Sequence, residues 1–160
     1  SRKVTHVTEK QPYPDHPERF DEESLTGRCY WEAEWSGKGL YVSVTYKGIS
    51  RKGSSDDCWF GFNEKSWSLS WFNDSFTARH NENITDISAP SCHSNRVGVY
   101  LNWPAGRLSF YSVSDTNTLT HLHTFNTTFT EPLYAGFGVY SDSSVSLREF
   151  NMFQKHLRRS

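Results

Sequence analysis

Residues 30–46 read YWEAEWSGKGLYVSVTY, and this stretch decides the fold. The two tryptophans of its first half alternate with Glu32 and Glu34, so apolar and charged side chains fall on opposite faces of an extended strand. Segment 36–39 contains two glycines and predicts a turn, after which apolar residues again occupy every second position of 40–46. The stretch therefore predicts two successive β-strands, each with one face toward a core and one toward solvent.

The same short alternating runs recur along the rest of the chain. They are rich in β-branched and aromatic residues and are separated by turn clusters such as Asn73-Asp74-Ser75 and Pro104-Ala105-Gly106. Short strands at this spacing are typical of an antiparallel β-sandwich or barrel. The polar segment 80–96 is predicted to be the longest loop. Further strands are expected at 58–62, 67–72, 76–79, 97–101, 107–111, 119–125 and 133–140.

Length and composition predict one domain with an aromatic core. A chain of 160 residues has the usual size of a single domain. Its 11 Phe, 8 Tyr and 6 Trp exclude bulk disorder, although only 35% of the residues are hydrophobic. No stretch approaches the roughly 20 consecutive apolar residues that span a bilayer. With 17 Lys and Arg against 18 Asp and Glu, the net charge of -1 argues against nucleic-acid binding.

Few residue patterns suggest chemistry. Glu32 and Glu34 share a strand face with Cα atoms about 6.6–6.8 Å apart, which invites comparison with a glycosidase pair, although such a pair more often marks a solvent face. His121 and His123, expected on one strand face, would supply half of a zinc site. The three cysteines lack C-x-x-C spacing and predict reduced thiols in the cytosol. We therefore expect no catalytic residue, no metal and no cofactor.

The aromatic residues of segment 67–72 are more informative. Trp67 and Trp71 share a face with Leu69, so alternation predicts that they belong to the core. Phe72 points the other way, beside the turn that begins at Asn73. A large apolar residue in that position is either covered by another part of the chain or exposed as an anchor for a partner. The alternation leaves both interpretations open.

Several segments resemble, in order, the motifs of the SPRY domain and of the PRY segment that precedes it. The sequences of these segments are most similar to those of the PRY/SPRY domains of fish tripartite-motif ligases, NOD-like receptors and the stonustoxin group of venom proteins. The segments are PDHPERFD (14–21), LTGRCYWEAEW (25–35), GFNEKSWSL (61–69), VGVYLNWPAGRLSFY (97–111), HTF (123–125) and FTEPLYAGF (129–137).

The resemblance divides the chain into a partial PRY segment at 1–24, a SPRY domain at 25–147 and a C-terminal tail at 148–160. The tail departs from the usual ending of the family. Four of its residues, three of them apolar, fall at the i, i+3, i+4, i+7 spacing of a short amphipathic helix, which would be marginal by itself. The residues in this pattern are Phe150, Phe153, Gln154 and Leu157.

The resemblance implies an all-β fold with little helix: a bent antiparallel β-sandwich, the concanavalin-like jelly roll of SPRY domains. It also implies a protein-recognition module whose ligand surface is built from variable loops at one edge of the sandwich. By motif position, the residues expected to bind a partner are Lys47, Gly48, Arg51, Ser70, Phe72, Asn73, His80, Asn126 and Phe129.

The expected function is therefore non-enzymatic binding of a protein target or peptide. The domain would be the substrate- or ligand-sensing part of an innate-immune ligase or receptor in the cytoplasm. Two alternatives stay open. The chain could be the C-terminal domain of a stonustoxin-like pore-forming subunit, which would be secreted and glycosylated at the N-x-S/T sequons of Asn73, Asn83 and Asn126. It could also be a glycan-binding sandwich, since aromatic faces and exposed carboxylates suit sugars.

Overall fold

The computed structural model describes residues 2–6, 18–19, 24–47, 63–91, 93–139 and 142–153. Within these ranges the chain forms twelve strands and no helix. The strand expected at 58–62 lies outside them. In chain order the strands are β1 (Arg2–His6), β2 (Glu18–Arg19), β3 (Arg28–Ser36), β4 (Gly39–Tyr46), β5 (Ser66–Phe72), β6 (Ser75–His80), β7 (Asn83–Ile87), β8 (Arg96–Asn102), β9 (Arg107–Val113), β10 (Leu119–Asn126), β11 (Leu133–Val139) and β12 (Ser143–Phe153).

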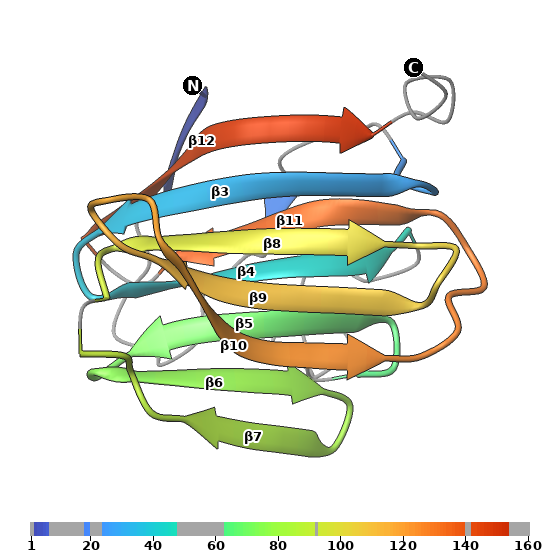
Figure 1. Cartoon of the computed structure of the whole chain (residues 1–160), viewed down its shortest axis with the longest axis horizontal. Coiled ribbons are helices and arrows are strands. Elements are labelled where there is room, and N and C mark those ends of the chain that lie inside the picture. Colours follow the sequence, from blue (N-terminus) through green and yellow to red (C-terminus); the bar gives the residue numbers. More distant parts are fainter. Residues whose placement is uncertain are drawn as a thin grey trace.

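The strands form two six-stranded sheets that pack face to face (Figure 1). The first sheet has the order β1-β12-β3-β8-β9-β10, and the second has the order β2-β11-β4-β5-β6-β7. Every pairing between neighbouring strands in these sheets is antiparallel. The all-β antiparallel sandwich expected from the sequence is therefore confirmed.

The core lies between the two sheets and is built from the inward positions of each strand. In the first sheet, Trp31 pairs with Val99 and Val99 pairs with Phe110, so these three fully buried residues form one row across β3, β8 and β9. In the second sheet, Val42 lies between Leu69 and Phe137 in the same way. Each such side chain stabilises the fold by about 1.5–3 kcal/mol relative to an exposed one.

Glu32 lies on the outward face, as alternation predicts, but it is buried there and does not face solvent. Its relative exposure is only 9%. Tyr30 donates a hydrogen bond of 2.7 Å to Glu32 Oε2, and Nε of Arg96 lies 3.2 Å from Glu32 Oε1. The physical reason is Gly98, the β8 partner of Glu32. A Cβ atom at this glycine would lie 2.3 Å from the Tyr30 hydroxyl oxygen, so only glycine lets the tyrosine lie across the sheet.

We predict that Glu32→Ala lowers the free energy of unfolding by about 2–3 kcal/mol, because it leaves Arg96 and the Tyr30 hydroxyl without their carboxylate partner. Glu34→Ala is the matched control. Glu34 pairs with Arg148 at 2.7 Å, but both side chains are 45% exposed, and its removal is expected to change stability by less than about 1 kcal/mol. Urea unfolding followed by tryptophan fluorescence measures both values. Equal losses in the two variants would contradict the structural role of Glu32.

A β-bulge in β10 changes which face its histidines occupy. His121 pairs with Tyr111, but the register shifts before His123, which pairs with Phe110. Phe110 is a core residue, so His123 falls on the inward face and His121 on the outward one. The expectation that the two histidines share a face is therefore wrong. A bulge adds one residue to a strand and inverts the alternation after it, which strict period-2 counting cannot reveal.

Segment 80–96 is not one long loop, because it contains strand β7. This strand pairs with β6 along its whole length, from Phe76↔Ile87 to His80↔Asn83. Its residues are mostly exposed, since β7 is the last strand of the second sheet. A strand with neither face buried carries no hydrophobic alternation, and backbone pairing with β6 alone defines it.

The helix expected in the C-terminal tail is wrong for Phe150 and Phe153. Both lie in β12, whose backbone pairs with β3 as far as Phe153↔Arg28. A single amphipathic turn is too short to be stable alone, whereas pairing with β3 satisfies the backbone. Gln154 and Leu157 lie outside the described residues. The division of the chain into PRY segment, SPRY domain and tail stays a prediction.

Candidate partner-binding surface

The expected partner-binding residues fall at two opposite ends of the sandwich. The first, the Lys47 end, includes Lys47, His80, Asn126 and Phe129 and lies on the right in Figure 1. The second, the Asn73 end, includes Ser70, Phe72 and Asn73 and lies on the left. The seven residues of β5 rise about 3.3 Å each, so the two ends are about 20 Å apart. Gly48 and Arg51 lie outside the described residues.

Phe129 belongs to the core. Its relative exposure is 4%, and its ring packs edge-on against Trp67 with the centroids 5.0 Å apart. Trp103 stacks beside it at 6.5 Å and donates a hydrogen bond of 2.8 Å from Nε1 to the Glu131 carbonyl oxygen. Packing therefore accounts for Phe129, which the resemblance places among the partner-binding residues. The segment that follows β10 folds back over the end of the sandwich and buries this ring.

His80 is also held in place by the fold. Its ring stacks on Trp67 with the centroids 4.3 Å apart and the planes 4° from parallel. Its Nδ1 lies 2.8 Å from the carbonyl oxygen of Ser66, so this nitrogen donates a hydrogen bond to the backbone. His80 thus lies beside a core tryptophan, on the opposite face of the second sheet from Phe72. The structure does not bring His80 and Phe72 together.

On the outward face of the second sheet, the positions of β4 from Gly39 to Thr45 are all buried, and β5 is accessible only toward the Asn73 end. The outward positions of β4 and of the first half of β5 are buried, although most of these side chains are polar. Farther along β5, Ser70 and Phe72 are half-buried. The accessible part of this face therefore begins at Ser70 and Phe72. The covered positions are Tyr41, Ser43, Thr45, Ser66 and Ser68.

A tight hairpin follows Phe72 and shapes the Asn73 end. Asn73 and Asp74 have φ angles of 56° and 61°, and positive φ at both central residues is the requirement of a type I′ turn. Asn and Asp tolerate this conformation better than other non-glycine residues. Phe72 pairs with Gly39 on one side and Ser75 on the other, so its cross-strand neighbours are small. The turn expected at Asn73 is confirmed.

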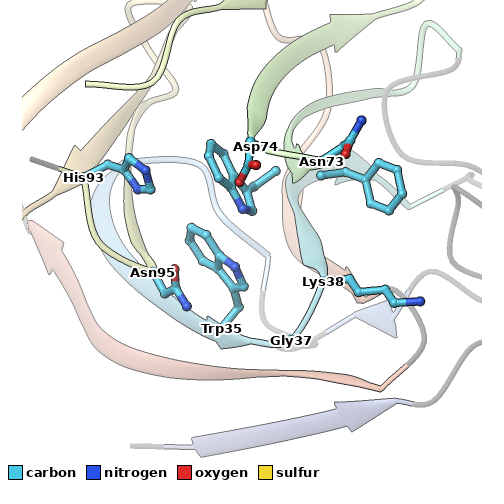
Figure 2. A pocket seen from close by; sticks show the side chains of 9 residues that line it. Trp35, Gly37, Lys38, Asn73, Asp74, His93 and Asn95 are labelled. Carbon is cyan, nitrogen blue, oxygen red and sulfur yellow. The ribbon is translucent and has the colours of Figure 1, made fainter. Parts of the chain in front are cut away.

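A hollow of about 540 Å³ lies beside this hairpin (Figure 2). Its base includes two indoles, with the ring centroids of Trp35 and Trp71 6.2 Å apart, and its rim is closed by the β3–β4 turn. Gly37 in that turn has a φ of 95°, and a Cβ there would lie 2.5 Å from the Asp142 carbonyl oxygen. The lining residues are Trp35, Gly37, Lys38, Trp71, Phe72, Asn73, Asp74, His93 and Asn95.

Sequence reasoning found only part of this surface. Phe72 and Asn73 were expected from alternation and from the turn. His93 and Asn95 come from the segment before β8, which has no local pattern that indicates a site. Trp35 was expected as a core residue, and it is buried, yet its ring also lines the hollow. The signal available in the sequence was the pair of turn motifs, one with Gly37 and one with Asn73-Asp74. In an antiparallel sheet, alternate turns along the chain fall at the same end, so these two turns could be expected to lie near each other.

The titratable groups of the described chain do not form a reactive centre. Burial raises the pKa of the Cys29 thiol to about 12, so this thiol stays protonated at neutral pH and is a poor nucleophile. Burial and the nearby charge of His121 lower the pKa of His123. Among the described residues, no three His, Cys, Asp or Glu side chains gather in a way that could hold a metal ion. No helix in that part is long and apolar enough to cross a membrane.

Two antiparallel sheets with turns gathered at each end define an antiparallel β-sandwich domain, with an aromatic hollow between two of those turns. The chain belongs to the SPRY domain family, whose model matches residues 28–151. SPRY domains are protein-interaction modules of tripartite-motif proteins and stonustoxin subunits.

Similar proteins come from both groups. Stonustoxin subunit beta of Synanceia horrida is 44% identical over 145 residues, which cover 86% of this chain and 20% of the toxin subunit. Tripartite motif-containing protein 16 of Mus musculus is 41% identical over 146 residues, which cover 86% of this chain and 26% of that protein. The chain thus spans only about a fifth to a quarter of the length of these relatives.

Solved structures agree with this fold. The stonustoxin structure superimposes with a TM-score of 0.69 at 43% identity, over 79% of this chain and 20% of the toxin chain. The TRIM65 PSpry domain superimposes with a TM-score of 0.79, over 92% of this chain and 80% of that domain. Its identity is 24%, so it supports the fold alone.

Proposed function

We propose that this domain recognises a protein or peptide target through the Asn73 end of the sandwich. The observation that carries the proposal is the position of Phe72. It is an aromatic side chain on the part of the outward face that remains accessible, and it borders the hollow beside the hairpin. Interfaces concentrate their binding energy in a few aromatic anchors surrounded by polar groups. Ser70, Asn73 and Asp74 supply such polar surroundings.

We expect Phe72→Ala to weaken binding of a purified target at least tenfold, or about 1.4 kcal/mol. Ile84→Ala is the matched control. Ile84 lies on β7, away from the Asn73 end, and is 52% exposed. Its replacement by alanine therefore truncates an apolar side chain outside the proposed surface. The target is first captured by crosslinking to the wild-type chain and identified, and both variants are then measured with it by calorimetry. Equal weakening by the two variants, or none by Phe72→Ala, would refute the proposed surface.

The parent protein is inferred from the relatives, which include tripartite-motif proteins, and from the sequence resemblance, which alone suggests NOD-like receptors. We favour a tripartite-motif ligase or NOD-like receptor of innate immunity, in which this domain would hold a target in the cytoplasm for an activity located elsewhere in the chain. A stonustoxin-like toxin subunit is the second candidate, favoured by the 44% identity with stonustoxin subunit beta. In the full-length chain, a RING or nucleotide-binding region would support the first assignment.

Glycosylation separates the two candidates. The sequon asparagines Asn73, Asn83 and Asn126 are all exposed, so each is accessible to a glycan. A secreted parent protein isolated from its native tissue would lose mass after treatment with an N-glycosidase, whereas a cytoplasmic one would not. Loss of mass therefore favours the toxin subunit.

A further inference from the structure

The hollow at the Asn73 end contains polar groups that make no hydrogen bond or ion pair with the described part of the chain. One is the Asp74 carboxylate, at the exposed tip of the hairpin, and another is the side-chain amide of Asn95. The third is Nδ1 of His93, which is buried without a partner. Buried polar atoms in folded proteins almost always have a partner, so Nδ1 of His93 lacks one that a bound group or a water molecule can supply.

The walls between these polar groups are aromatic. The ring centroid of Trp71 lies 4.9 Å from that of His93 and 6.2 Å from that of Trp35. The faces of such rings carry negative electrostatic potential and attract cations. In Figure 2, Asp74, Asn95, His93 and Trp35 gather around the hollow, whereas the Lys38 side chain extends away from them. Among the described residues that line the hollow, the only full charge directed at the indoles is therefore the carboxylate of Asp74.

We propose that the hollow binds an arginine side chain of the partner. This inference rests on the proposed function and specifies the chemistry of the target. A guanidinium is planar and stacks on aromatic rings, while its five N–H groups can donate to the Asp74 carboxylate and the Asn95 amide oxygen. An ammonium has no planar face to stack, and an anion would be repelled by Asp74. The hollow thus favours arginine over lysine and excludes acidic side chains.

The test uses acetyl-arginine methylamide as a probe and the ¹⁵N-labelled chain. The indole Nε1–H signals are followed by NMR and assigned with Trp35→Phe and Trp71→Phe variants. We expect the signals of Trp35 and Trp71 to shift and saturate, with a dissociation constant on the order of 1–10 mM. The signal of Trp103 should not move, because that indole lies at the Lys47 end.

Asp74→Asn is the decisive variant, since asparagine keeps the positive φ of the turn while removing the charge. We expect this variant to raise the dissociation constant of the arginine probe about fivefold or more. Asp86→Asn is the control, because Asp86 is an exposed carboxylate on β7 outside the hollow. Acetyl-citrulline methylamide, the neutral analogue, should not bind, and acetyl-lysine methylamide should bind more weakly. The proposal would be overturned if the Asp74→Asn variant bound the arginine probe as tightly as the wild-type chain does. It would also be overturned if the wild-type chain bound the citrulline or lysine probe as tightly as the arginine probe.

Failure of this inference can be told apart from failure of the proposed function. If Phe72→Ala weakens binding of the target while the arginine probe does not bind, the Asn73 end is still the binding surface and the assignment of arginine is wrong. If the probe binds at the hollow but neither Phe72→Ala nor Asp74→Asn affects the target, the target is recognised elsewhere, and the proposed function is wrong.

Discussion

Replacing Phe129 with alanine is expected to destabilise the fold by about 3–5 kcal/mol. The variant removes a buried ring that packs edge-on against Trp67 and beside Trp103, and it leaves a cavity where that ring was. For a chain of this length, such a loss lowers the melting temperature by roughly 10 °C. Thermal unfolding followed by circular dichroism measures the shift.

Phe72→Ala is the matched control for this experiment, because it makes the same chemical change at the opposite end of the sandwich. Phe72 is half-buried, so its truncation should cost no more than about 1 kcal/mol of unfolding free energy. The pair of variants thus separates a core phenylalanine from a surface one. A small effect of Phe129→Ala, or a large effect of Phe72→Ala, would reverse the assignment of the two residues.

Gly106→Ala is expected to cost about 3 kcal/mol or more, although it adds a single methyl group. Gly106 has a φ of 70°, a conformation that costs other residues about 1–2 kcal/mol. A Cβ atom there would also lie 1.7 Å from the Thr127 carbonyl oxygen. The backbone must move to relieve this clash, which breaks the hydrogen bond of 2.8 Å from the Thr127 amide to the Gly106 carbonyl oxygen.

Gly27→Ala provides the matched control for the glycine variant. A Cβ at Gly27 would meet no atom within 4 Å, so alanine should be neutral or stabilise the fold by a few tenths of a kcal/mol through the unfolded state. Urea unfolding measures both variants. If Gly106→Ala were as stable as the control, the contact between the β8–β9 turn and the segment after β10 would not exist as described.

Alternation predicted the strands wherever apolar side chains occupy the inward positions and mostly polar side chains the outward ones. Residues such as Trp31, Val42 and Leu69 lie inward as expected, because each strand turns its successive side chains to opposite faces. The same rule misassigned His123, where a bulge inverts the order, and missed β7, where neither face is buried. Both failures occur where backbone pairing, rather than side-chain burial, determines the strand.

The partner-binding surface was only partly predictable. Phe72 and Asn73 were expected from local features: an outward position and a turn sequence. His80 and Phe129 were expected from motif position alone, and the structure places both beside Trp67 at the other end. Motif position gives the place of a residue along the chain, whereas its exposure depends on which segments fold over it.

The resemblance to SPRY domains selected the two-sheet sandwich. The amino-acid sequence by itself determined the short strands of a sandwich or barrel, the aromatic core and the turn at Asn73. Each of these depends on residues close together in the chain, through strand alternation and the conformational preferences of turn residues. Only the tertiary structure decided which aromatic rings are buried and where a binding hollow forms. Phe129 is buried by residues far from it in sequence, and the hollow joins Trp35, Asp74 and His93 from three separate segments. Such contacts arise from packing, which no local pattern encodes.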